Sequence, residues 1–490
     1  MANIGHRGLH ASFWGGLEIA VRYGVQIAVT VILARLLVPD DFGLIAILLV
    51  FTSVGALLAD AGFGTALIQR REHTIDDETT MFFISLGTGF AATLILYLTA
   101  NIIADFYNKP TLAPLTKFMA WALFFGSAGA VPDALLTKRL DFNARTRAQA
   151  LSSIVSGALA IILALQKFGV WSLAWQGMTE TVLRTFFMWQ FSRWMPRGRF
   201  RVDSFRALFN FGGYMLLAGV LSTISSRLQS LVIGKLFTAR DLGYYVLAQN
   251  TQAAPSSVVA ILLNRIGLPV FSSMAHDRAQ LRLALQVSLQ ASMFVFFPCM
   301  LGLAMIAKPF VTMMYGAQWT PATPMLTLLA LAASIWPIHV LNLLALSACG
   351  RSDRFLRLEL IKNIVVVAVT LLASLFGPTA VAAAMLVAGI CAAWINTWYS
   401  KRTFDYGLLQ QIVDLKSTLL ITLIAMLPAW AILHWAPEGI VMTLAAVCSA
   451  IVVYVGMARL SKHPALIEII HVLKLVGEAY SKKTSSRHDP

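Results

Sequence analysis

Apolar residues along the chain form long uninterrupted runs, separated by short polar or Pro/Gly-containing stretches. Each run has about 17–28 residues, enough to cross a hydrocarbon core of ~30 Å as a helix. The period-2 alternation of a membrane β-barrel is absent. The pattern therefore predicts an all-α, polytopic membrane protein with fourteen transmembrane helices, at approximately 12–37, 43–66, 80–104, 113–134, 150–166, 170–192, 208–234, 243–264, 283–307, 324–348, 358–376, 379–399, 418–434 and 439–458.

Composition and charge indicate the same class of protein. The 490 residues are 58% hydrophobic and only 12% charged, about half of the ~25% that is usual in a soluble domain. The formal net charge of +15 comes from short Lys/Arg clusters between the apolar runs. Such clusters set membrane topology and argue against a nucleic-acid partner. With a cytoplasmic N-terminus, 27 Lys/Arg fall in cytoplasmic segments and 7 in outer loops, which predicts that both termini are cytoplasmic.

Motifs for catalysis, cofactors or metals are missing from the sequence. It contains no GxxxxGK[ST] phosphate loop, no HExxH and no GxSxG. The four cysteines are too far apart for a metal site. The N-terminus runs into a span of about 25 residues, which is too long for a cleavable signal peptide. We expect a protein that is not an enzyme and that needs no cofactor or catalytic metal.

A short motif occurs twice, 200 residues apart. The sequence ARLLVPDDFGL at 34–44 corresponds to GKLFTARDLGY at 234–244, with Gly43 matching Gly243. In both places the motif joins the first and second spans of a set of six on the outer face; the alternative is two chance loops. We expect pseudo-symmetric lobes in parallel orientation. The predicted parts are an N-terminal lobe at 1–206, a C-terminal lobe at 207–402, two additional helices at 403–460, and a cytoplasmic amphipathic helix and tail at 461–490.

Ionisable residues within the predicted spans are the candidate site. A charge at bilayer depth costs roughly 2.5–3.5 kcal/mol on insertion scales and normally faces a cavity or a partner. Glu18 and Arg22 in the first span, like Glu180 and Arg184 in the sixth, lie four residues apart and can pair. Alternatively, either pair is a neutral ion pair within one helix whose only role is to fix helix packing. Arg227 in the seventh span has no acid three or four residues away.

Amides accompany these charges. The predicted set is Gln26 one turn beyond Arg22, Gln229 beside Arg227, and Gln249, Asn250 and Gln252 in the eighth span. Amides at this depth line a cavity or form hydrogen bonds between helices. Arginine binds phosphate through forked donors, so we expect Arg22, Arg184 and Arg227 to hold a diphosphate or acidic sugars. Glu18 and Glu180 would position the arginines or exchange protons, and the amides would meet sugar hydroxyls.

Other polar residues in the spans are weaker candidates. Lys362 lies near Glu359 about one turn into its span, and we expect it to snorkel to the headgroups. His339, Asn342 and Asn396 are weaker cavity candidates. Asp60 and Asp133 lie near the cytoplasmic ends of their spans and are not included in the predicted site.

Several stretches resemble the Wzx-type polysaccharide and O-antigen flippases of the MOP superfamily, nearest to the branch that contains the colanic acid exporter. They are ILARLLVPDDFGLIAI, LLADAGFGTALIQRRE, FGVWSLAWQ, and the segments at 138–145, 315–326 and 348–353. The resemblance implies a MATE-like bundle with alternating access and a cationic central cavity. It also implies transfer of an undecaprenyl-diphosphate-linked oligosaccharide from the cytoplasmic to the periplasmic leaflet of a bacterial inner membrane, for exopolysaccharide or lipopolysaccharide biosynthesis. Expected partners are membrane lipids, and a polysaccharide polymerase with chain-length proteins.

Three other functions remain open at this point. The first is a cation-coupled exporter of small molecules such as drugs, from the same superfamily. The second is a membrane glycan polymerase or ligase, against which the short outer loops argue. The third is a passive scaffold for glycan assembly. The sequence does not identify the glycan, the coupling ion or the oligomeric state.

Overall fold

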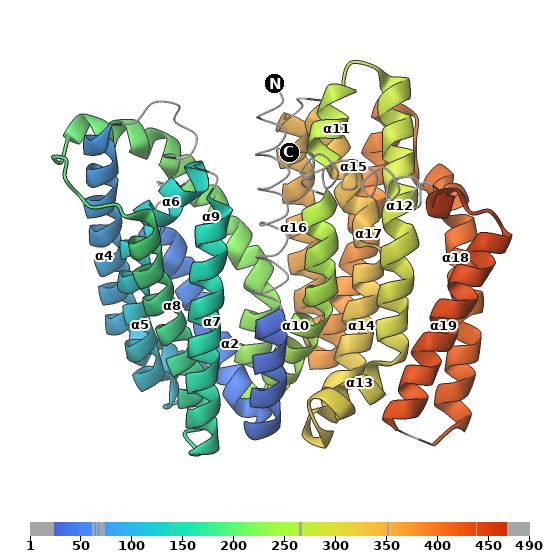
Figure 1. Ribbon diagram of the computed structural model, residues 1–490, viewed down its shortest axis with the longest axis horizontal. Helices are drawn as coiled ribbons and strands as arrows, with labels where there is room; N and C mark the ends of the chain where they lie inside the picture. The colour runs from blue at the N-terminus through green and yellow to red at the C-terminus, as the bar shows by residue number, and fades with distance from the viewer. Residues whose placement is uncertain are drawn as a thin grey trace, which may run out of the picture. The chain divides into compact units, whose positions relative to one another are not determined.

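The computed structural model describes residues 24–60, 64, 67, 74–139, 141–263, 267–349, 352–437 and 439–467, and within these ranges it contains helices and no strand (Figure 1). By its internal contacts the chain divides into two compact units, 1–247 and 248–490, and each unit is described by itself. The lobe boundary expected at 206/207 stays a prediction.

The first unit consists of helices that cover most of the first six predicted spans and the seventh. They are the helix Gly24–Leu36, α2 (Pro39–Asp60), α4 (Ile75–Tyr107), α5 (Leu112–Ala128), α6 (Ala130–Lys138), α7 (Phe142–Leu165), α8 (Val170–Ser192), α9 (Val202–Leu236) and the beginning of α10 (Ala239–Leu262). α5 and α6 are bent by 41° against each other. Gly129 separates them and Pro132 lies in the first turn of α6, a combination that interrupts a helix.

The second unit holds the rest of α10 and the remaining helices. They are α11 (Leu268–Ser273), α12 (Arg278–Met305), α13 (Ala307–Met314), the 3₁₀ helix η2 (Ala317–Ala322), α14 (Thr323–Ser334), α15 (Trp336–Ala348), α16 (Ser352–Ser374), α17 (Pro378–Phe404), α18 (Leu408–Trp435) and α19 (Ile440–Leu460). After α19, Ala465 and Leu466 pack against Phe294 and Tyr454. The rest of the predicted amphipathic tail lies outside the described residues.

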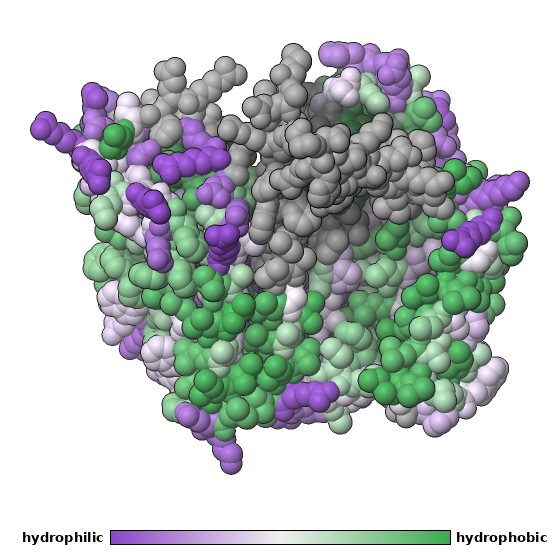
Figure 2. All heavy atoms as spheres, viewed as in Figure 1, coloured by the Kyte–Doolittle hydropathy of each residue, from purple (hydrophilic) through white to green (hydrophobic). Residues whose placement is uncertain are grey.

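The helices present apolar surface that suits lipid. In the described ranges, eight helices are long and apolar enough to cross a membrane, or nine if the bent α5–α6 pair is one span. Large apolar side chains such as Leu98, Ile364 and Val452 are about two-thirds exposed, and hydrophobic residues cover much of the height of the visible helices (Figure 2). Such exposure disfavours a soluble protein. The all-α, multi-pass membrane class is confirmed, but the count of fourteen spans is not.

The segment between α8 and α9 is bound to the first turns of α4. The backbone amides of Gly198, Arg199 and Arg201 donate to Thr79 Oγ1 at 2.9 Å, Asp76 Oδ1 at 2.8 Å and Thr80 Oγ1 at 3.0 Å. A Cβ on Gly198 would lie 2.6 Å from the carbonyl oxygen of Ile75, so only glycine fits this contact. The segment fixes the end of α8 and the start of α9.

The two copies of the repeated motif pack against each other at the starts of α2 and α10, inside the first unit. A Cβ on Gly43 would lie 1.7 Å from the carbonyl oxygen of Ala239, and one on Gly243 would lie 2.0 Å from that of Pro39. Each contact is the other shifted by 200 residues, so a local pseudo-twofold relates them. Glycine is required because the two backbones touch. Arg240 Nε bridges the pair to Asp40 Oδ2 at 2.8 Å.

Two amide contacts of the second unit join neighbouring helices. Asn342 on α15 and Gln411 on α18 exchange hydrogen bonds of 3.0 and 2.9 Å and are fully buried. The Asn396 amide donates to the carbonyl of His339 at 2.8 Å. The amides of Asn342 and Asn396 therefore form hydrogen bonds between helices.

Lys362 differs from its expectation. Its side chain is only 10% exposed and pairs with Glu359 one turn earlier. Snorkelling is therefore not observed, because a local acid compensates the ammonium.

Candidate functional site

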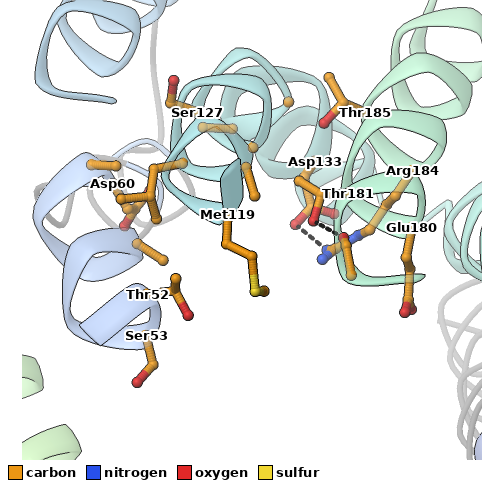
Figure 3. A pocket seen from close by; sticks show the side chains of 18 of the residues that line it. Thr52, Ser53, Asp60, Met119, Ser127, Asp133, Glu180, Thr181, Arg184 and Thr185 are labelled. Carbon is orange, nitrogen blue, oxygen red and sulfur yellow. Dashed lines mark hydrogen bonds and ion pairs between the residues drawn. The ribbon is translucent and has the colours of Figure 1, made fainter. Parts of the chain in front are cut away.

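A cavity of about 530 Å³ lies within the first unit, between α2, α5, α6, α8 and α9 (Figure 3). Small residues on the facing helices, including Ala56, Gly126 and Gly177, leave the space open. Met119, Leu123 and Met188 supply apolar wall. The polar lining residues are Thr52, Ser53, Asp60, Ser127, Asp133, Glu180, Thr181, Arg184, Thr185 and Arg227.

Most hydroxyl groups of the cavity are anchored to their own helices, whereas Thr185 donates to the carbonyl of Phe125 on α5 at 3.0 Å. Thr52 donates to the carbonyl of Leu48 at 3.1 Å, and Thr181 donates to that of Gly177 at 2.9 Å. Each hydroxyl uses its only hydrogen in this way and keeps oxygen lone pairs. The hydroxyls can therefore accept hydrogen bonds from a ligand without losing their helix contacts.

Asp133 of α6 lies between two arginines. Arg145 Nε of α7 approaches Asp133 Oδ1 at 2.8 Å, and Arg184 Nη2 of α8 approaches Oδ2 at 3.4 Å. Figure 3 shows Arg184 reaching toward Asp133 while Glu180 points away from it. Between the described side chains, no Glu180–Arg184 ion pair forms, so that expected contact is wrong. α6, bent away from α5, supplies the competing acid.

Glu180 is held by the neighbouring helix instead. Its Oε1 accepts hydrogen bonds from Gln149 Nε2 at 2.9 Å and from Ser153 Oγ at 3.0 Å, both on α7. Gln149 Nε2 also donates to Ser153 Oγ at 3.0 Å. Two neutral donors therefore fix the carboxylate of Glu180.

Arg227 of α9 also lines the cavity. Among the described residues no ion pair to Arg227 is found. Arg184 is half engaged by Asp133, so Arg227 is the guanidinium that is more available to a ligand. Gln229, two residues further, is 4% exposed and does not line the cavity.

The remaining predicted site residues are not gathered here. Glu18 and Arg22 lie outside the described residues. Gln26 is exposed and away from the cavity. Gln249, Asn250 and Gln252 belong to the second unit. Asn250 is exposed, and Gln252 donates to Ser256 on its own helix at 2.5 Å.

Sequence reasoning missed Asp60 and Asp133 as cavity residues. Both lie near the ends of their spans, and the only signal for Asp133 was an acid beside the helix-breaking Pro132. The described lining therefore holds three acids and two arginines. The cationic central cavity that the resemblance implies, which includes Arg22, stays a prediction. Within the same ranges no three His, Cys, Asp or Glu side chains are placed to hold a metal ion.

We expect Asp133→Ala to lower the unfolding temperature by a few degrees. The change leaves Arg145 and Arg184 without their shared carboxylate, and unpaired charges in a partly buried site are costly. The measurement is thermal unfolding of the purified protein in detergent. Asp105→Ala, at an exposed carboxylate of α4, is the matched control and should unfold like wild type. Equal unfolding temperatures for the two variants would show that Asp133 does not hold this network.

Apolar helices around a cavity of ligand size, with paired and unpaired charges inside it, define a multi-pass helical membrane protein that can accommodate a polar ligand. The particular family follows from its sequence. The chain belongs to the polysaccharide biosynthesis protein family, whose sequence profile matches residues 32–324. The family expected from the sequence motifs is thereby confirmed.

Curated relatives carry names from polysaccharide assembly. A succinoglycan biosynthesis transport protein of Rhizobium meliloti is 29% identical over 322 residues, which are 66% of this chain and 65% of the relative. A lipopolysaccharide biosynthesis protein of Escherichia coli is 26% identical over 64% of this chain and 65% of its own. The matches thus span slightly less than two thirds of these relatives. The names fit the expectation of a protein that is not an enzyme.

Solved structures show the fold. A lipid II flippase in an inward closed conformation superposes with a TM-score of 0.76 at 17% identity, covering 92% of this chain and 98% of that one. An inward-facing multidrug resistance MATE transporter of the MOP superfamily gives 0.61 at 15% identity, covering 78% and 94%. The MATE-like fold class is confirmed by these likenesses.

Proposed function

We propose that this protein is a flippase for undecaprenyl-diphosphate-linked oligosaccharide, which it moves from the cytoplasmic to the periplasmic leaflet of a bacterial inner membrane for exopolysaccharide or O-antigen biosynthesis. The observation that carries the proposal is the cavity within the bundle, lined by Arg227 without an ion-pair partner among described residues and by a set of hydroxyls. A diphosphate suits the guanidinium and sugars suit the hydroxyls.

Each group of the cavity has a proposed task. Arg227 binds the diphosphate, and Arg184 joins it by exchanging Asp133 for phosphate, because the Arg184–Asp133 contact of 3.4 Å is the longer of the two made by Asp133. Thr52, Ser53 and Thr181 accept hydrogen bonds from the sugars. The lipid tail remains in the hydrocarbon core throughout, so moving it between leaflets requires no transfer of apolar surface into water. The contribution of Glu18, Arg22 and the amides at 249–252 stays a prediction.

Alternating access completes the proposal. Lobes at 1–206 and 207–402 would rock so that the cavity opens to one side at a time, with both termini in the cytoplasm as the Lys/Arg distribution predicts. The contact of Gly43 with Ala239 and of Gly243 with Pro39 would close the outer side and separate for release. A polymerase and chain-length proteins would receive the unit.

The test is the sidedness of the lipid-linked oligosaccharide in cells that lack the protein. We expect units to accumulate on the cytoplasmic leaflet, measured by their protection from a membrane-impermeant periodate reagent in spheroplasts. Re-expression of the wild-type gene should return them to the accessible leaflet. Units that reach the outer leaflet but stay unpolymerised would contradict a flippase and indicate a polymerase or ligase.

A cation-coupled exporter is the second candidate. It is favoured by the carboxylates of Asp60, Asp133 and Glu180 in the cavity, since buried acids suit cationic ligands. Deletion would then raise susceptibility to cationic drugs and leave glycan sidedness unchanged. The flippase predicts the reverse pair of results.

A further inference from the structure

The carboxylate of Glu180 lines the cavity and forms no ion pair with a cation of the described residues. Its Oε1 is held at 2.9 and 3.0 Å by Gln149 and Ser153, which are neutral. Its Oε2 has no hydrogen bond or ion pair with any residue in the described ranges. The negative charge is thus fixed in direction by α7 while one oxygen remains available.

Asp133 makes an instructive contrast on the same cavity wall. Both of its oxygens receive a guanidinium group, from Arg145 and Arg184. Its charge is therefore compensated by the protein. Glu180, one turn from Arg184 on α8, is not compensated in this way, although sequence spacing offers it the same arginine.

An ionised carboxylate is an acceptor only. A ligand satisfies it with hydroxyl or amino donors and not with another carboxylate, which would place two like charges within a few ångströms. Two hydrogen-bonded donors also leave little freedom for Glu180 to turn away from such a ligand. The arginines would bind the diphosphate end of a glycosyl diphosphate. The fixed acid beside them would then face the sugar end.

We propose that Glu180 is a specificity-determining residue that accepts a hydrogen bond from a sugar hydroxyl or amino group and rejects units with a carboxylate at that position. The inference rests on the proposed function and deepens it by naming the sugar class: neutral or amino sugars rather than uronic acids. It also replaces the expected role of Glu180 in positioning Arg184.

The experiment compares three probes on the purified full-length protein in detergent. Two are prenyl-diphosphate disaccharides that differ only in a terminal hexose or the corresponding hexuronate, and the third is prenyl diphosphate alone. We expect wild type to bind the hexose probe about tenfold or more tightly than the hexuronate, a ratio on the order of screened like-charge repulsion. Glu180→Gln should reduce the ratio to about twofold or less, and prenyl diphosphate should bind at least as tightly as to wild type because a negative charge near Arg184 is removed.

Glutamine keeps the shape of the side chain and an amide oxygen for Gln149 and Ser153, so the variant removes the charge with little else. Asp105→Asn removes an exposed carboxylate from the same unit and should keep the wild-type ratio. If Glu180→Gln does not fold, Gln149→Met loosens the carboxylate and should lower the ratio in part.

Each outcome decides between the claims. Equal affinity of wild type for both disaccharides, or a ratio that survives Glu180→Gln, would overturn the assignment of Glu180 while prenyl diphosphate binding upholds the proposed function. Failure of wild type to bind any of the three probes would overturn the proposed function itself. A wild-type ratio abolished by Glu180→Gln and retained by Asp105→Asn supports the inference.

Discussion

Replacing Arg227 by alanine should abolish export while the protein still inserts into the membrane. Arg227 lines the cavity from α9, and among the described residues no acid pairs with it. Hydrogen bonds to charged groups contribute about 1.5–3 kcal/mol, which corresponds to roughly 10- to 150-fold weaker diphosphate binding. The measurement is leaflet sidedness of the lipid-linked oligosaccharide in a deletion strain that carries the variant, with membrane-inserted protein quantified in parallel.

Two further variants make the Arg227 result interpretable. Arg227→Lys keeps the charge but loses the forked donors, so it should retain only part of the export. Arg240→Ala removes a guanidinium outside the cavity, paired to Asp40, and should still allow diphosphate binding. Normal export by a well-inserted Arg227→Ala would show that the diphosphate binds elsewhere, and the undescribed Arg22 would become the next residue to test.

The fold class was predictable because lipid imposes one dominant constraint. Long apolar runs can only be helices in a hydrocarbon core, and their exposed side chains, such as Leu98 and Ile364, agree with that solvent. The repeated motif at 34–44 and 234–244 also marked a structural contact. Its two glycines are the positions where the backbones of α2 and α10 meet, a consequence of an internal repeat.

The site was only partly predictable, since helical spacing reports neighbours on one helix and not across helices. Glu180 and Arg184 have ideal i,i+4 spacing, yet Arg184 contacts Asp133 and Glu180 contacts Gln149. The bend at Gly129 that brings α6 to this wall is a tertiary property. Arg227 lines the described cavity, where an isolated charge can be hydrated, and its role in binding stays a prediction.

The amides of α10 show the same limit. Asn250 and Gln252 were expected to line a cavity because lipid penalises polar groups within a span, but Gln252 is satisfied by Ser256 one turn away on its own helix. In the same unit Asn342 is satisfied across helices by Gln411. A polar residue within a span can be satisfied on its own helix, across helices or by a cavity. The sequence is the same in all three cases, so composition alone does not distinguish them.

Cross-linking the repeated motif to itself should stop export reversibly. Asp40 and Arg240 form an ion pair of 2.8 Å between the starts of α2 and α10, where the pairs Gly43–Ala239 and Gly243–Pro39 bring the backbones into contact. Cysteines at positions 40 and 240 should form a disulfide on mild oxidation. If this contact is the closed outer gate, the covalent bond prevents the separation that release requires.

The four native cysteines form no disulfide, and Cys299 and Cys448 are exposed, so the new pair is introduced after all four are replaced by serine or alanine. We expect export to fall to the level of the deletion strain after oxidation and to recover with a membrane-permeant reductant. Each single variant, Asp40→Cys or Arg240→Cys, should export under both conditions. The single variants lose the same ion pair without forming the bond, so they separate the effect of tethering from the loss of charge.

Full export by the oxidised double variant, with the disulfide verified by mass spectrometry, would mean that the motif is a permanent hinge. The contact that opens on the outer side would then lie elsewhere. Two helix starts joined by a disulfide cannot open a passage for an oligosaccharide between them. A block relieved by reduction would instead explain why the repeat retains glycine at both 43 and 243. Close approach is then a property of one conformation, and any larger side chain would hold the outer side partly open.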